Sequence, residues 1–197
     1  SAFCLVLVAG WLFCPPTIMA ADESCASCDF QVSATGQFVH YKYPKNLVIQ
    51  GAQGDVSDFR EEIYGKNFTI TVSHLPAGKY RVLIGECETY CKEPGQRVFD
   101  VTSGDTVLAT NFDIVAAAGG ANKACYITGS VDHAEDSIEG PLSFTFTGRE
   151  NNAKLNTFTI QNAAGDSVIS FDASDLAYHY SEEALRVPEV TGPAIWR

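Results

Sequence analysis

Two polar segments of this 197-residue chain carry side chains that could bind a ligand. The first contains Glu88 and Tyr90, and the second contains Arg149, Asn151 and Asn152. A tyrosine ring can stack on the apolar C–H face of a sugar, while amide, carboxylate and guanidinium groups hydrogen-bond its hydroxyls. These residue types therefore predict a carbohydrate site if the fold brings both loops together. Alternatively, Tyr90 could merely cover its neighbours and the asparagines could be ordinary turn residues.

The segment 78–113 supplies the elements that must position the first loop. Residues 80–84 are rich in Tyr, Val, Leu and Ile, and residues 97–101 alternate polar and apolar side chains, so both flanks of the loop are predicted to be strands. Gly104-Asp105 is a short turn signal that predicts a hairpin with the following strand. Strand, loop, strand and hairpin thus follow one another in fewer than forty residues.

The rest of the chain predicts more strands and little helix. In residues 67–72, Phe68, Ile70 and Val72 alternate with threonines, which is typical of a half-buried strand. Further strands are predicted at residues 124–131, 142–146, 154–160 and 167–171. Short strands at this spacing predict an all-β fold, namely a β-sandwich.

Residues 22–57 form an N-terminal segment with weaker signals. Phe30, Val32, Phe38 and Val39 suggest one or two short edge strands. The apolar run 47–49 is predicted to enter the sheet. Residues 57–64 are predicted to form a helical turn, with Ser57 or Asp58 as the N-cap.

Both ends of the chain differ from the middle. Residues 1–21 combine an uncharged apolar run with a small-residue cleavage pattern, which predicts a secretory signal peptide whose start is missing. The run is too short to span a membrane of about 30 Å, and no other apolar run approaches that length. Residues 173–197 contain two prolines and little alternation, and are interpreted as a linker. We therefore expect a secreted or extracellular protein, with the ER lumen as another location.

The formal net charge of −11 argues against a nucleic-acid partner, because phosphate binding requires clustered Lys and Arg, and the chain has only 13 of these residues. A neutral ligand fits this charge better. No glycine-rich phosphate loop occurs in the sequence, and no cofactor is predicted.

Five cysteines remain after the predicted cleavage. Cys25, Cys28, Cys87 and Cys91 form two closely spaced pairs that could in principle hold a zinc ion, but disulfides are the expected outcome in an oxidising compartment. A bridge between Cys87 and Cys91 would clamp the loop around Tyr90. Cys125 could be a buried free thiol.

The chain has one Asn-X-Ser/Thr acceptor, at Asn67-Phe68-Thr69, where a eukaryotic secreted form could be N-glycosylated. Asp132, His133, Glu135 and Asp136 form the densest titratable cluster, and a carboxylate pair could in principle cleave a glycosidic bond. Their crowding beside small residues favours a solvated loop instead. Since no nucleophile-elbow pattern is present either, we expect this segment not to be an enzyme.

The order of several motifs resembles the malectin family. These motifs are GKYRVLIGECETY at residues 78–90, GQRVFDV at 95–101, NFDIVAAAGG at 111–120 and GRENNAKLNTFTIQN at 148–162. The resemblance covers about residues 58–172, which we expect to form the malectin-like domain. The family's usual opening, with its tyrosine-bearing loop, is not recognisable in residues 22–57.

This resemblance implies a jelly-roll β-sandwich that binds oligosaccharides or polysaccharides rich in glucose. The family's sugar-contacting aromatic pair falls on Tyr90 and Cys91, and its late-loop aspartate falls on Asn151. Another contacting tyrosine of the family falls on Glu61, with Tyr64 three residues away as a substitute.

Three roles stay open at this point. The chain could be a stand-alone lectin, or the accessory module of a glycoside hydrolase whose catalytic domain follows Arg197. It could also be a structural or protein-interaction ectodomain module.

Overall fold

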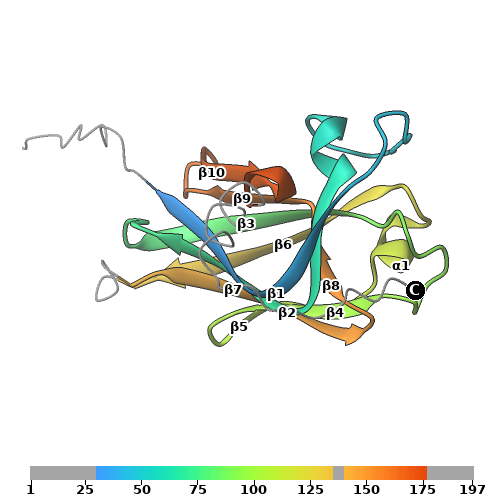
Figure 1. Cartoon of the computed structure of the whole chain (residues 1–197). Coiled ribbons are helices and arrows are strands. Elements are labelled where there is room, and N and C mark those ends of the chain that lie inside the picture. Colours follow the sequence, from blue (N-terminus) through green and yellow to red (C-terminus); the bar gives the residue numbers. More distant parts are fainter. Residues whose placement is uncertain (1–29, 135–139, 177–197) are drawn as a thin grey trace, which may run out of the picture.

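The computed structural model describes residues 30–134 and 140–176, which form two antiparallel β-sheets packed face to face (Figure 1). One sheet has the strand order β1-β2-β7-β4-β5, with β8 beside β2, and the other has the order β10-β9-β3-β6. The predicted all-β sandwich is therefore confirmed. The elements are β1 (Gln31–Lys42), η1 (Val56–Arg60), β2 (Glu61–Ser73), β3 (Gly78–Cys87), β4 (Val98–Ser103), β5 (Thr106–Phe112), α1 (Ile114–Ala118), β6 (Ala124–His133), β7 (Leu142–Glu150), β8 (Ala153–Leu155), β9 (Thr157–Gln161) and β10 (Ser167–Asp172).

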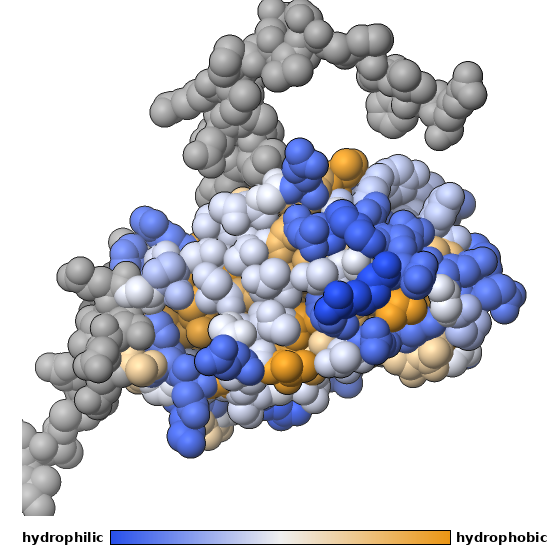
Figure 2. All heavy atoms as spheres, turned by 90° about the horizontal axis from the view of Figure 1, so that it is seen from below, coloured by the Kyte–Doolittle hydropathy of each residue, from blue (hydrophilic) through white to orange (hydrophobic). Residues whose placement is uncertain are grey.

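Alternation along β2 shows how the sequence builds the core. Phe68, Ile70 and Val72 are buried between the sheets, and the Phe68 ring stacks on that of Phe146 at 4.7 Å. The intervening threonines face outward, where Thr69 hydrogen-bonds Thr145 on β7 at 3.2 Å. The view from below in Figure 2 shows pale, weakly polar side chains across this face, bordered by hydrophilic ones. The predicted half-buried strand is confirmed.

The strands predicted on either side of the Tyr90 loop are also present. They are β3 and β4, and β4 pairs with β5 through the predicted hairpin at Gly104, whose φ of 53° suits glycine. β3 lies in the four-stranded sheet, whereas β4 lies in the six-stranded one. The loop therefore bridges the two layers at one end of the sandwich.

The N-terminal segment is more regular than predicted. In place of one or two short edge strands, β1 is a single strand of 12 residues that pairs with β2 almost throughout. Its register shifts between Gln37 and Val39, opposite Gly65. A Cβ on Gly65 would lie 2.1 Å from the carbonyl oxygen of Gln37, so the close approach of the two strands requires glycine there.

Two other expectations for this segment were wrong. The apolar run 47–49 does not join a sheet as a strand: Val48 is exposed, and Ile49 packs with Phe59 and Cys87 in a small separate cluster. The predicted helical turn is shorter than 57–64, because β2 already begins at Glu61. Its cap is Asp55, whose carboxylate accepts a hydrogen bond from the Ser57 N–H at 2.8 Å.

The strand predicted at 154–160 is divided at Asn156, where the chain passes from one sheet to the other. The Asn156 amide oxygen accepts a hydrogen bond from the Cys87 N–H at 2.9 Å, and its amide nitrogen donates to the Glu61 carbonyl at 2.7 Å. A buried side chain thus takes over the hydrogen bonds that a continuous ladder would have made. β8 consequently lies in the six-stranded sheet and β9 in the four-stranded one.

The predicted signal peptide lies outside the described residues, and so does most of the predicted linker. In the part of the chain that the structure describes, no helix is long and apolar enough to cross a membrane. β1, from the N-terminal segment, and β2 belong to the same sheet, so the described part of residues 22–57 packs with the sandwich.

Candidate functional site

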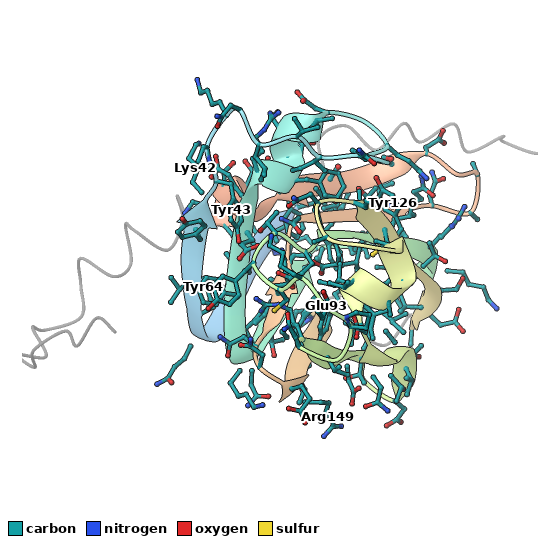
Figure 3. The ribbon with its side chains drawn as sticks, turned by 90° about the vertical axis from the view of Figure 1, so that its right-hand side faces the viewer. Lys42, Tyr43, Tyr64, Glu93, Tyr126 and Arg149 are labelled. Atoms are coloured by element: carbon teal, nitrogen blue, oxygen red, sulfur yellow. The ribbon has the colours of Figure 1, made fainter. Side chains whose placement is uncertain are left out.

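A cavity of about 400 Å³ lies at the end of the sandwich where the β3–β4 loop bridges the sheets. Figure 3 looks onto this end and labels Tyr43, which directly follows β1, and Tyr64 of β2, with Glu93 of the β3–β4 loop. Tyrosine and asparagine make up most of the lining, which consists of Tyr41, Tyr43, Glu62, Tyr64, Tyr90, Arg97, Asn151 and Asn152.

Two of the tyrosines stand at the end of β1. Tyr41 and Tyr43 are two positions apart, and their rings meet edge-on with centroids 4.7 Å apart. The Tyr43 N–H donates to the Arg60 carbonyl at 2.7 Å, and its hydroxyl donates to Glu62 at 3.2 Å. Burial and the nearby negative charge of Glu62 raise the pKa of the Tyr43 hydroxyl, which therefore stays neutral. Tyr41, by contrast, is 48% exposed and offers its ring to solvent.

Tyr90 projects from a loop that a buried carboxylate holds from beneath. One oxygen of Glu88 accepts hydrogen bonds from the backbone N–H groups of Tyr90 at 2.9 Å and Cys91 at 3.0 Å. The side chain of Tyr90 is 73% exposed, whereas that of Glu88 is fully buried. The loop backbone is therefore fixed while the aromatic ring stays accessible.

The same carboxylate connects this loop to the second one. The other oxygen of Glu88 accepts a hydrogen bond from Arg97 Nε at 2.6 Å, and Arg97 Nη1 donates to the Asn152 carbonyl at 2.9 Å. Burial alone would raise the pKa of Glu88, but the charges of Lys154 and Arg97 and the two loop N–H donors outweigh it, and the pKa lies below its usual value. Glu88 is therefore ionised at neutral pH, and its charge holds the two loops together.

Asn151 and Asn152 form the turn between β7 and β8. Asn151 has a φ of 61°, a left-handed conformation that asparagine tolerates better than most residues. Its side-chain oxygen accepts a hydrogen bond from the Asn152 N–H at 2.9 Å, and its carbonyl accepts one from Lys66 at 3.2 Å. Turn geometry and cavity lining are thus combined in the same two residues.

A second buried ion pair lies under the tyrosines. Lys154 of β8 is bonded to Glu62 of β2, and it also donates to the Cys87 carbonyl at 2.6 Å. Both side chains of the pair are almost completely buried. Burial would lower the pKa of Lys154, but the surrounding carboxylates outweigh it and the pKa is raised, so the lysine remains charged. Glu62 thus contacts both Lys154 and the Tyr43 hydroxyl.

The structure divides the seven residues that the sequence suggested as carbohydrate contacts. Four of them line the cavity: Tyr64, Tyr90, Asn151 and Asn152. The other three do not line it. Glu88 and Cys91 lie beneath the loop with at most 4% exposure, and Glu61 is bonded to His40 at 2.9 Å and to Lys42. Glu88 therefore holds the loop backbone and is not placed to contact a ligand directly.

Four lining residues were missed by the sequence reasoning, namely Tyr41, Tyr43, Glu62 and Arg97. The Tyr-x-Tyr spacing before Pro44 puts two aromatic rings on one face of a strand, which is a signal that could have found the first two. No sequence pattern indicates that Glu62 and Arg97 line the cavity. Glu62 pairs with Lys154, which is distant in sequence, and Arg97 pairs with Glu88, which lies in a loop.

The cysteines do not pair as expected. Cys87, Cys91 and Cys125 are free thiols, so a bridge between Cys87 and Cys91, one of the pairings that the sequence allowed, is not formed. Cys87 packs with Ile49 and Phe59, whereas Cys91 approaches the Asn151 amide at 4.0 Å, so the two thiols have different surroundings. Cys25 and Cys28 lie outside the described residues. Within residues 30–134 and 140–176 no group of His, Cys, Asp and Glu is arranged to hold a metal ion.

The fold and the site together define a β-sandwich with a tyrosine- and asparagine-lined cavity at one end. The malectin domain family matches residues 28–166, well over half of the chain. The protein therefore belongs to the malectin family. The match begins before β1, thirty residues upstream of the segment 58–172 in which the resemblance was visible by motif. A search of curated proteins returned no match.

Solved structures with the same fold include plant receptor ectodomains. The ANXUR2 extracellular domain from Arabidopsis thaliana aligns with a TM-score of 0.56 at 16% identity, over 66% of this chain and 40% of that one. The ANX1 ectodomain from Arabidopsis thaliana gives 0.56 at 14%, over 67% and 41%. A structure of the plant peptide RALF23 in complex with FER and LLG2 gives 0.52 at 16%, over 62% and 38%. The chain thus spans about two fifths of these chains, and the likeness concerns the fold alone.

Proposed function

We propose that this malectin domain is a non-catalytic carbohydrate-binding module that binds a neutral, glucose-containing glycan in the tyrosine-lined cavity. The observation that carries the proposal is the convergence of Tyr41, Tyr43, Tyr64 and Tyr90 with the Asn151 and Asn152 amides around one cavity. Aromatic rings beside hydrogen-bonding groups without free charge match the two kinds of surface that a sugar offers.

The charges at the cavity support a neutral ligand. Glu62 and Arg97 line the cavity, but each forms an ion pair with a buried partner: Glu62 with Lys154, and Arg97 with Glu88. No unpaired cation among these lining residues is left to recognise a carboxylate or sulfate group, and the net charge of −11 repels acidic glycans. The volume of about 400 Å³ lies in the usual range for sites of small ligands.

A glycan array probed with the purified chain would test the proposal directly. We expect signal on neutral gluco-oligosaccharides, and we expect Tyr90→Ala to lose most of it without unfolding, because the ring is 73% exposed and contributes little to the core. Stacking on an aromatic ring contributes about 0.5–1.5 kcal/mol beyond buried area. Tyr80→Phe is a control, since Tyr80 is buried, does not line the cavity and donates to the Pro76 carbonyl. Absence of signal on every neutral glycan would contradict the proposal.

A peptide ligand is the second candidate. The structural neighbour FER is described in complex with the peptide RALF23, and Tyr41 and Val39 at the end of β1 are exposed apolar side chains that could contact a polypeptide. A protein-interaction ectodomain would explain these exposed side chains without any sugar. Peptide binding that survives Tyr90→Ala and Asn151→Ala but is lost in Tyr41→Ala would favour this candidate.

We also propose where the protein is located and which role this domain has in the full-length protein. The ectodomain neighbours make a secreted or extracellular location the natural one for this chain. In that setting it could act alone or be an appended module of a glycoside hydrolase. Mass spectrometry of the native protein would decide, because an appended catalytic domain would add sequence after Arg197.

A further inference from the structure

A cluster of five ionisable side chains, each at most 5% exposed, lies at the cavity, and two of them line it. The five are Glu62, Glu86, Glu88, Arg97 and Lys154. Three of them are carboxyl groups and only two are cations. Burying a charge is costly unless an opposite charge compensates it, so the cluster cannot hold all three carboxyl groups in their ionised form without a large penalty.

Hydrogen bonds identify the carboxyl group that lacks a cation. Glu62 is bonded to Lys154, and Glu88 is bonded to Arg97 at 2.6 Å. Glu86 is fully buried, and neither of its oxygens has a hydrogen-bond partner in the described part of the chain. Its side chain is therefore the one that gains most from carrying a proton.

The position of Glu86 on β3 explains its burial. It follows the core residues Val82 and Ile84 at alternate positions, so strand geometry points it between the sheets. On β6 it is paired with Cys125. The titratable and charged groups that act on it come from β2, β8, β6, the end of β3 and the β3–β4 loop, and they are Glu62, Lys154, Cys125, Cys87, Glu88 and Arg97.

The balance of these influences favours the neutral acid. Burial raises the pKa of Glu86 well above its usual value, and the negative charges of Glu62 and Glu88 act in the same direction. Lys154 and Arg97 act in the opposite direction without reversing the shift. Both cations are already engaged by other carboxylates, Lys154 by Glu62 and Arg97 by Glu88.

We propose that Glu86 carries a proton when the site is intact, and that its ionisation at higher pH loosens the cavity above it and weakens ligand binding. The effect on binding rests on the proposed function, whereas the buried proton does not. On ionisation the proton leaves to solvent, and the new carboxylate competes with Glu62 and Glu88 for the two cations. Since Glu62 accepts from the Tyr43 hydroxyl and Glu88 holds the Tyr90 loop, this competition acts on both walls of the cavity.

The sign of the stability effect follows from the raised pKa. The contribution of a neutral, buried carboxyl group is fully present below the unfolded-state pKa of about 4.3. It is lost progressively as the pH rises toward the folded-state value. The Glu86→Gln variant keeps the shape of the neutral acid but cannot ionise. Its stability therefore does not show this decrease as the pH rises.

The test measures urea-induced unfolding of the full chain and of Glu86→Gln from about pH 5 to about pH 8. We expect the unfolding equilibrium constant of the wild type to increase, relative to the variant, by at least about tenfold over this range. Glu93→Gln is the matched control, because Glu93 is an exposed carboxylate on the neighbouring loop, and its profile should parallel that of the wild type. Parallel profiles for the wild type and Glu86→Gln would overturn the proposal.

A second measurement keeps the proposal testable if Glu86→Gln does not fold. The infrared C=O stretch of a protonated carboxyl group should be visible in the wild-type chain at about pH 7 and disappear as the pH rises; its absence would overturn the proposal. With maltose as the probe, wild-type affinity should fall several-fold toward high pH while that of Glu86→Gln stays constant. An equal loss of maltose affinity in both proteins would contradict the proposed coupling between Glu86 ionisation and ligand binding. If neither protein binds maltose while the infrared band titrates, the proposed function has failed for this sugar but the buried proton has not.

Discussion

Glu88 offers a sharp test of the idea that buried charge holds the cavity together. Its carboxylate accepts from the backbone of Tyr90 and Cys91 and from Arg97 Nε, and it is fully buried. In Glu88→Gln one acceptor oxygen becomes an NH2 group, so a donor must face another donor. Removing one partner of a buried ion pair typically costs about 3–5 kcal/mol, because the remaining charge stays buried without compensation. We expect a loss of this size in the free energy of unfolding.

Urea-induced unfolding measured by circular dichroism would provide that number. Lys79→Gln is the control, since it removes an exposed ion pair with Asp132 at 3.7 Å that should contribute no more than about 1 kcal/mol. Trypsin provides a local readout, because Lys92 lies in the same loop and should be cleaved faster in Glu88→Gln. A loss below about 1 kcal/mol, with unchanged cleavage at Lys92, would refute the reasoning, since it would place the pair in the energy range of exposed ion pairs.

Three further predictions concern separate parts of the sandwich. Gly65→Ala should destabilise the protein by about 1–3 kcal/mol in thermal or urea unfolding, because the added Cβ would lie 2.1 Å from the Gln37 carbonyl oxygen. An unchanged stability would contradict this prediction and show that the two strands can move apart. Asn67 is exposed on β2, so a chain secreted from eukaryotic cells should lose mass on treatment with an N-glycosidase, and Asn67→Gln should not. Cys87 and Cys91 should react with a thiol reagent only after unfolding, because both are buried and free; a native mass lower by two hydrogens would show a bridge instead.

Local patterns predicted the parts of the fold whose side chains respond to their immediate neighbours. The alternation of Phe68 and Thr69 identified a half-buried strand because side chains in a strand point to opposite faces. The hairpin at Gly104 was predictable because its backbone requires a positive φ. β1 was underestimated because it is an edge strand whose exposed side chains break the alternation, and its regularity comes from pairing with β2.

The site was harder to predict because its supports connect residues far apart in sequence. Lys154 and Glu62 are 92 positions apart, and a lysine in a strand pattern gives no indication that it will be buried. Asn156 divides a predicted strand through hydrogen bonds to Cys87 and Glu61, which the chain brings close only after folding. The exposed Tyr90, by contrast, could be predicted from its polar loop alone.

Cys91 shows how the aromatic surface of this cavity is organised. The family resemblance places an aromatic ring at that position, but the Cys91 side chain is 4% exposed and approaches the Asn151 amide beneath the loop. A larger ring there would have to displace the loop or the β7–β8 turn. Besides Tyr64 and Tyr90, the rings that line the cavity come from Tyr41 and Tyr43 at the end of β1. Because Glu62 supports Tyr43 and Glu88 supports Tyr90, both walls of the cavity depend on buried charged side chains, of which Glu62 lines the cavity and Glu88 does not.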